Sequence, residues 1–260
     1  MRSHRANRSA SARSKRNRRK RNWFRAILVF LALVLIGELG YLALTSPKLR
    51  IARIDVRGAE TVSVSDLRDR AKSALGKNII LADTQAVRRE VLKNPVVMKA
   101  KVYRRPLNRL VIRVEERKPF AIMVAGGTSY LMDEKGFVYA KAGKRPTGVL
   151  ILELRGSKPV RVASKPYRRL VSGFFECLET GRKNKFKIAK ISIDPSSNMC
   201  LNMESGLWVK LGPPLDLNDK FKVLKDVLTH KPEIAAQALY VDMRCVTAPA
   251  WKSKDASPTP

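Results

Sequence analysis

The residue types that most often carry enzymatic chemistry are sparse in this 260-residue chain. It has two histidines, His4 and His230, and His230 falls at the end of an expected helix, where its ordinary role is to favour the helix dipole. The catalytic patterns G-x-S-x-G, S-x-x-K and H-E-x-x-H do not occur. The acids stand singly, without a pair suited to acid–base work. We therefore predict no catalytic residue and a protein that is not an enzyme.

The three cysteines, Cys177, Cys200 and Cys245, contain no C-x-x-C pair, and with two histidines they give no metal-ligand spacing. In an oxidising compartment two of them could form a disulfide, in any of three pairings. Buried free thiols are the alternative. We expect no metal site and no cofactor.

The net charge of +31 arises from 53 Lys and Arg against 22 acids. Eleven of these basic residues lie in the first 25 residues, and the rest of the chain is basic as well. No aromatic stacking platform is interleaved with them, so we expect a solvated basic surface and no specific nucleic-acid partner. Outside the cytoplasm, the matching negative charges would be anionic lipid headgroups, acidic wall polymers or acidic partners.

The segment 26–44 is almost wholly apolar, with Glu38 as its only charge. At ~1.5 Å rise per residue, such a helix nearly crosses the ~30 Å hydrocarbon layer of a bilayer. A cleavable signal peptide is the alternative, but its apolar core is usually shorter and only a weak cleavage site follows at residues 43–45. We predict an uncleaved membrane helix over residues 23–45.

Basic residues before this helix outnumber those after it, eight against four within fifteen residues on each side. This asymmetry predicts a single-pass type II protein, with a disordered basic tail (1–22) in the cytoplasm and the body outside. Within the helix, Gly37 and Gly40 flank Glu38. Small residues beside a carboxylate indicate a contact with another membrane helix; a tolerated acid near the outer third is an equal alternative.

Hydrophobic periodicity predicts two folded units after the helix. Residues 52–57 alternate as a strand, and two amphipathic helices follow, the first with Ser63 as N-cap and Asp66 as its capping-box partner, the second with Asp83 as N-cap. Two more alternating strands, 96–103 and 109–115, complete a strand–helix–helix–strand–strand unit with both helices on one face of the sheet. The remainder is rich in short strands with a helix over 165–180, another near 217–228 and a last strand over 239–246.

These segments resemble the bacterial cell-division family FtsQ/DivIB, whose body is a POTRA domain followed by a β domain. The resemblance rests on the order of short fragments: Ile54–Gly58, Gly76–Ile79, Asn94–Val97, Arg105–Pro106, Val114–Ala121, Leu131–Asp133, Gly136–Tyr139, Gly206–Gly212, Lys220 and Val241–Arg244. It covers residues 23–251, and residues 142–161 align poorly. It implies an α+β fold: a single transmembrane helix, a POTRA domain (β-α-α-β-β) over 49–119, and a β-rich domain over 120–251 with a mixed or antiparallel sheet and helices. A disordered tail, 252–260, follows.

The family resemblance implies a non-enzymatic divisome scaffold in the cytoplasmic (inner) membrane at the septum. Its partners would be FtsB/DivIC-like and FtsL-like proteins, with FtsW/FtsI-like and FtsK-like proteins as further ones. A partner strand would add to the free edge at the end of the β domain. By position, that edge comprises Tyr240, Asp242, Arg244, Cys245, Thr247 and Ala248. The alternative is that this stretch is simply the last core strand of the sheet.

Two other functions remain open. The first is an envelope assembly or secretion factor built on POTRA units, which the single such unit here disfavours. The second is a membrane-tethered binder of anionic polymers, which rests on the charge alone.

Overall fold

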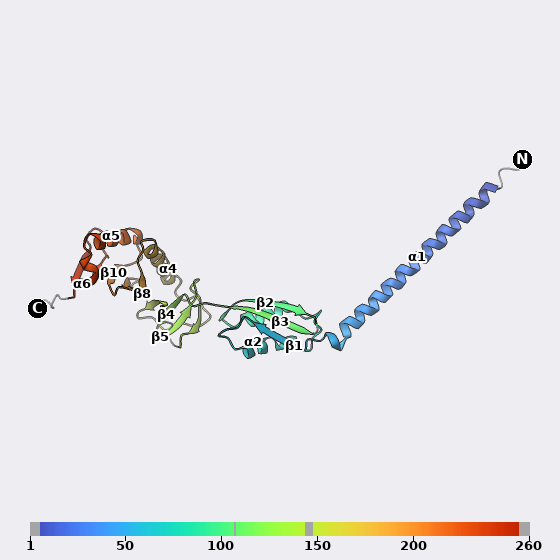
Figure 1. Ribbon diagram of the computed structural model, residues 1–260, viewed down its shortest axis with the longest axis horizontal. Coiled ribbons are helices and arrows are strands. Elements are labelled where there is room, and N and C mark those ends of the chain that lie inside the picture. The colour runs from blue at the N-terminus through green and yellow to red at the C-terminus, as the bar shows by residue number, and fades with distance from the viewer. Residues whose placement is uncertain (1–5, 107, 144–147, 255–260) are drawn as a thin grey trace. The chain divides into compact units, whose positions relative to one another are not determined.

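The computed structural model describes residues 6–106, 108–143 and 148–254, with side chains described from residue 23 onward (Figure 1). It contains two compact units. The first comprises residues 1–91 and 100–114, and the second comprises residues 92–99 and 115–260. Each unit is described by itself below.

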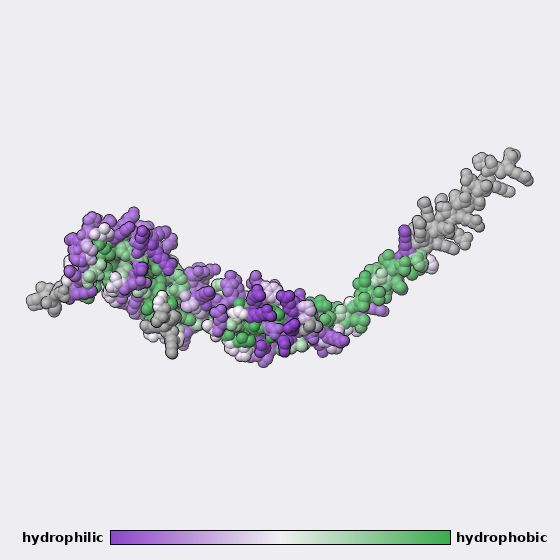
Figure 2. Space-filling model, viewed as in Figure 1, coloured by the Kyte–Doolittle hydropathy of each residue, from purple (hydrophilic) through white to green (hydrophobic). Residues whose placement is uncertain are grey.

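The first unit begins with one long helix, α1 (Ala6–Thr45). Its stretch Trp23–Thr45 is the one helix in the described part of the chain that is long and apolar enough to cross a membrane, and none of it is buried against the protein. Figure 2 shows the hydrophobic residues along this stretch. We expected residues 1–22 to be disordered; the backbone from Ala6 is helical, and residues 1–5 lie outside the description. Ala, Arg and Lys favour helix, and extending a nucleated helix costs little, which explains the difference.

After the 3₁₀ turn Pro47–Leu49, the predicted strand–helix–helix–strand–strand order is confirmed. Its elements are β1 (Arg53–Arg57), α2 (Val64–Arg70), the 3₁₀ turn Lys72–Ala74, α3 (Thr84–Leu92), β2 (Val97–Arg105) and β3 (Arg109–Glu116). The sheet order is β1-β3-β2, with β1 parallel to β3. One face of the sheet and the apolar faces of the two helices form a core of Ile54, Leu67, Val87, Val91, Leu110, Ile112 and Val114.

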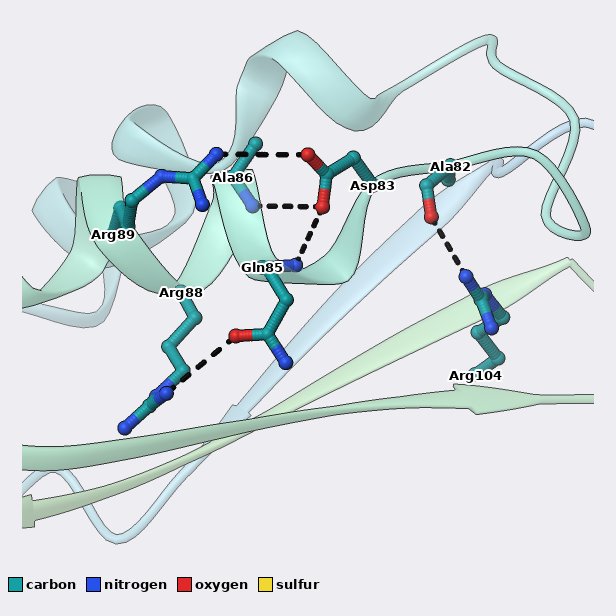
Figure 3. Close-up of polar contacts among 7 residues, drawn as sticks. All are labelled: Ala82, Asp83, Gln85, Ala86, Arg88, Arg89 and Arg104. Carbon is teal, nitrogen blue, oxygen red and sulfur yellow. Dashed lines mark hydrogen bonds and ion pairs between the residues drawn. The ribbon is translucent and has the colours of Figure 1, made fainter.

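The two predicted helix caps have opposite outcomes. Asp83 caps α3 as expected: its Oδ1 accepts hydrogen bonds from the backbone N–H groups of Gln85 (2.8 Å) and Ala86 (3.0 Å) (Figure 3). These bonds, that of Ala86 first, lower the pKa of the Asp83 carboxyl. Ser63 occupies the N-cap position of α2 as predicted, but its hydroxyl pairs with Ser65 and makes no cap bond to the helix.

The second unit is built on a nine-stranded mixed sheet, as the α+β prediction required. Its strand order is β12-β11-β10-β9-β8-β7-β4-β5-β6, with parallel pairing at β4·β7, β7·β8 and β10·β11. The strands are β4 (Ala121–Ala125), β5 (Thr128–Met132), β6 (Val138–Lys141), β7 (Leu150–Leu154), β8 (Ile188–Ile193), β9 (Met199–Met203), β10 (Trp208–Gly212), β11 (Ala238–Asp242) and β12 (Ala250–Ser253).

Three helices pack on this sheet: α4 (Arg168–Lys183), α5 (Leu217–His230) and α6 (Glu233–Gln237). Figure 1 shows α4 and α5 along the same side of β8 and β10. Gly181 directly follows the helix predicted over residues 165–180 and would suit its end, yet it lies inside α4. A Cβ at this position would clash with Ile188 and press on Phe221, which explains the glycine. The large buried side chains Phe174 and Phe221 anchor the two longer helices on the core.

Candidate functional site

The outermost strand at the C-terminal end of the nine-stranded sheet is β12. It pairs antiparallel with β11 on one side, and within the described residues no strand pairs with its other side. The opposite end of the sheet is partly covered, because Val138 of β6 exchanges hydrogen bonds with Ala163 and Ser164. A strand with one free side offers a row of backbone donors and acceptors to another chain. The edge at β12 is therefore the more open of the two.

The register across the last three strands fixes what a neighbour of β12 would meet. One cross-strand row runs from Trp208 through Tyr240 to Lys252. The adjacent row ends at Trp251, which lies beside the buried Val241 and is 43% exposed. A chain added to β12 would thus find Lys252 on one face of the sheet and the ring of Trp251 on the other. Trp is enriched among the interface residues that contribute most of the binding energy.

The loop after β11 is held in place by local contacts. Arg244 donates two hydrogen bonds to the carboxylate of Asp242, from Nη2 to Oδ2 at 2.6 Å and from Nε to Oδ1 at 3.0 Å. This pairing lowers the pKa of Asp242 and raises that of Arg244. The N–H of Met243 donates to the carbonyl of Lys210, whose Nζ lies 3.6 Å from the centroid of the Tyr240 ring.

The residues expected to form the recruiting edge are therefore not on the edge strand. The strand predicted over 239–246 ends at Asp242, so Tyr240 and Asp242 lie between β10 and β12. The others, Arg244, Cys245, Thr247 and Ala248, fall in the connection to β12. A partner-binding role for them stays a prediction, but Thr247 is not a ladder residue. The strand Ala250–Ser253 was not predicted, since the domain was expected to end at residue 251 and a tail to begin at 252. Four residues after Pro249 are too short to show strand periodicity.

The three cysteines differ in burial and in the pKa of their thiols. All three thiols are free in the structure. Burial raises the pKa of Cys177 to about 12 and also raises that of Cys200, whereas hydrogen bonds, that of the Thr247 side chain first, lower the pKa of the exposed Cys245. Among the described residues, no three His, Cys, Asp or Glu side chains gather as a metal site would require.

The half-buried Arg117 and the buried Lys220 of the second unit have structural partners. Arg117 donates from Nη1 to Oδ2 of Asp133 at 2.6 Å and from Nε to the carbonyl of Pro95 at 3.0 Å. Lys220, 3% exposed, donates from Nζ to the carbonyls of Leu211 (2.7 Å) and Pro213 (3.1 Å), and burial lowers its pKa. These bonds hold turns in place.

A second surface of interest is the face of the three-stranded sheet that the helices leave uncovered. A shallow hollow of about 510 Å³ there is lined by Arg57, Arg105, Arg109 and Arg113, together with Tyr103. Asp55 is the one acid that lines it. Within the described residues, none of these arginines makes an ion pair. Unpaired like charges at this density create a positive potential that attracts anions.

The membrane-helix residues Gly37, Glu38 and Gly40 share an exposed stretch of α1. A Cβ at either glycine would have nothing within 4 Å, so the surface around Glu38 is open. Another helix could approach closely there. That contact stays a prediction.

Comparison with known proteins agrees with this architecture. Residues 49–117 match the model of the POTRA domain, FtsQ-type. Over 87% of its length the chain is 26% identical to the cell division protein FtsQ of Streptomyces collinus, covering 87% of that protein. FtsQ of Streptomyces coelicolor is 24% identical over 86% of both chains, and the cell division protein DivIB of Clostridium tetani is 20% identical over 78% of both.

The first unit carries a POTRA domain of the FtsQ type, and most of the chain is similar to proteins named FtsQ and DivIB. The FtsQ-type match spans β1 to β3, which is the unit predicted as a POTRA domain, and the matches to FtsQ and DivIB extend into the nine-stranded sheet. These relatives are named as cell division proteins and not as enzymes. This similarity supports a role in cell division, and the described part of the chain has one N-terminal helix that is long and apolar enough to cross a membrane.

Proposed function

We propose that this protein is a non-enzymatic scaffold of the division machinery that recruits and links septal wall-synthesis proteins. It would be a single-pass type II protein of the cytoplasmic membrane at the septum, with a cytoplasmic N-terminus and both folded units outside. The observation that carries the proposal is the open edge of the nine-stranded sheet at β12.

The mechanism is β-augmentation. A strand of an FtsB/DivIC-like partner, held with an FtsL-like one, would pair with the free side of β12, so that main-chain hydrogen bonds supply affinity. Alternate side chains of that strand would meet Lys252 or Trp251, which supplies selectivity. FtsW/FtsI-like and FtsK-like proteins are further proposed partners, and the open surface at Gly37, Glu38 and Gly40 suits contact with a partner's membrane helix.

Proline scanning of β12 tests this mechanism. Successive N–H groups of a strand point to opposite sides, so one of Trp251 and Lys252 donates toward β11 and the other donates outward. Trp251→Pro and Lys252→Pro are compared for retention of the FtsB/DivIC-like partner on the purified full chain. The outward position should lose about tenfold in affinity, equivalent to one main-chain hydrogen bond of about 1 kcal/mol plus an unmet acceptor in the partner. Lys141→Pro in β6, at the other end of the sheet, is the matched control. Full partner binding by both β12 variants would refute the assignment of β12 as the partner-binding edge.

The topology has its own test. A reporter that is active only outside the cytoplasm, fused after residue 260, should give signal. An inactive but stable fusion would place the body inside and remove the basis for a wall-side scaffold.

A second function, binding of anionic polymers, is favoured by the arginine-lined hollow of the first sheet. Arg57→Gln with Arg113→Gln should weaken binding of a wall polymer such as teichoic acid, and added salt should weaken it further. The same charge removal at Lys225 and Lys231 is the control. Equal binding by both pairs would leave only nonspecific attraction to a basic protein.

A further inference from the structure

The loop formed by residues 75–81, here called the membrane-proximal loop, exposes three large apolar side chains. Leu75 is 41% exposed, Ile80 is 52% exposed and Leu81 is 66% exposed. Between them, Ile79 is buried in the core of the first unit and fixes the loop on it. The N–H of Ile80 donates to Oδ1 of Asn78 at 2.8 Å, which holds the local turn. The exposed side chains thus belong to an ordered loop, and nothing in the described unit covers them.

This loop is bonded to the end of the helix that can cross a membrane. Nδ2 of Asn78 donates to the carbonyl oxygens of Ala43 (2.9 Å) and Leu44 (2.8 Å), in the last turn of α1. The last four carbonyls of a helix have no partner within it, so these bonds satisfy groups that would otherwise need water. The loop is where the first unit caps its own membrane helix.

Backbone bonds tie the same loop to the linker that follows the helix. The N–H of Ile79 donates to the carbonyl of Leu49 at 2.8 Å, and the N–H of Ile51 donates to the carbonyl of Lys77 at 2.9 Å. Arg50 and Asn78 form an isolated antiparallel bridge. The loop is therefore held against residues 43–51, and the depth at which α1 leaves the lipid also sets the level of Leu75, Ile80 and Leu81.

We propose that the membrane-proximal loop is seated in the lipid surface at the C-terminal end of α1. Leu75, Ile80 and Leu81 would enter the boundary between headgroups and acyl chains, as the apolar faces of interfacial segments do. Lys48 and Lys77 are exposed beside them and can extend their ammonium groups to lipid phosphates. Figure 2 shows hydrophobic residues on the first unit close to the end of α1. The proposal rests on α1 crossing the membrane as proposed above, in which case chain connectivity brings the lipid beside α1 to the loop. The proposal does not depend on the β12 edge.

The test places one fluorophore on the loop of the full chain in phosphatidylcholine nanodiscs. In a Cys200→Ser, Cys245→Ser background, which keeps the buried Cys177, a Leu81→Cys variant is labelled with a polarity-sensitive dye. Emission is then measured with a spin label on lipid near the headgroup and, separately, with iodide in the water. Arg113→Cys is the control: it is exposed, and its strand pairing lies four residues, roughly 13 Å, beyond the Arg53–Arg109 pair where β1 and β3 begin.

We expect the lipid-borne quencher to reduce the emission of the Leu81 label about twofold, and iodide to quench it several-fold less than the Arg113 label. Iodide quenching equal at the two positions would overturn the proposal. So would protection from iodide without quenching by lipid, because a protein surface, such as a second copy of this chain, would then cover the loop. Equal lipid quenching at both positions would also overturn it, since the contact would not be specific to the loop.

Discussion

Replacing Arg117 by Met should destabilise the second unit strongly. The Arg117–Asp133 pair is largely buried, with side-chain exposures of 18% and 6%. Methionine keeps the unbranched apolar stem of the side chain but leaves the Asp133 carboxylate without its cation. Breaking a buried pair by removing one partner costs about 3–5 kcal/mol. The bond from Arg117 to the Pro95 carbonyl is lost as well.

The assay is urea unfolding of the full chain in detergent, followed by a probe in the second unit such as the fluorescence of Trp208 and Trp251. A loss of 3 kcal/mol shifts the unfolding equilibrium roughly 150-fold, well above the error of linear extrapolation. Arg155→Met is the matched control, because the Arg155–Glu153 pair has exposures of 51% and 27% and should contribute at most about 1 kcal/mol. If Arg117→Met costs no more than Arg155→Met, the buried pair does not stabilise the unit as argued.

Three further predictions concern individual groups. Gly58→Ala should lower the free energy of unfolding in urea by about 2–4 kcal/mol, because φ is +81° and the new Cβ would clash with the Val114 carbonyl oxygen. Gly76→Ala, at φ +75° with open space around it, should lower it by only about 1 kcal/mol. Equal losses in the two variants would refute the clash. Near neutral pH, Cys245 should be alkylated well before the buried Cys177, because its thiol pKa is lowered and that of Cys177 is raised. Site-resolved mass spectrometry measures the two alkylation rates, and comparable rates would contradict these pKa directions. Because Asp242 has a depressed folded-state pKa, its contribution to stability is present above the ordinary value near 4 and is lost as the pH falls through the folded value. Unfolding curves between pH 5 and 2 should show this loss in the wild type and not in Asp242→Asn; identical pH profiles would exclude it.

The first unit was predictable because its signals are local. Ile54, Leu110 and Ile112 recur at strand spacing, and the carboxylate of Asp83 sits where the backbone N–H groups of a helix begin. The Ser63 hydroxyl makes no cap bond because a hydroxyl can satisfy itself with a neighbour, here Ser65, at equal cost. The helical start at Ala6 was missed because a tail rich in Arg and Ser, with little apolar content, indicated disorder.

The sheet edge was harder to predict from sequence, because strand order in a mixed sheet is set by contacts far apart in the chain. Nothing in Ala238–Asp242 indicates that it pairs parallel to β10 and is covered by a later strand. Similarly, Gly181 is of the residue type that often ends a helix, yet here it lies inside α4 and allows Ile188 to pack closely against it. A glycine that ends a helix and one that admits a neighbour look the same until the neighbour is known.

In-cell photocrosslinking at the two ends of the nine-stranded sheet tests the central claim most directly. A photoreactive amino acid is placed at Lys252 of β12 or at Lys141 of β6, both exposed, in the full chain expressed at its natural level. The account predicts a covalent adduct with a small division membrane protein of the FtsB/DivIC kind from Lys252 and none from Lys141. An adduct that forms from Lys141 alone, or no adduct from Lys252 in dividing cells, would contradict it.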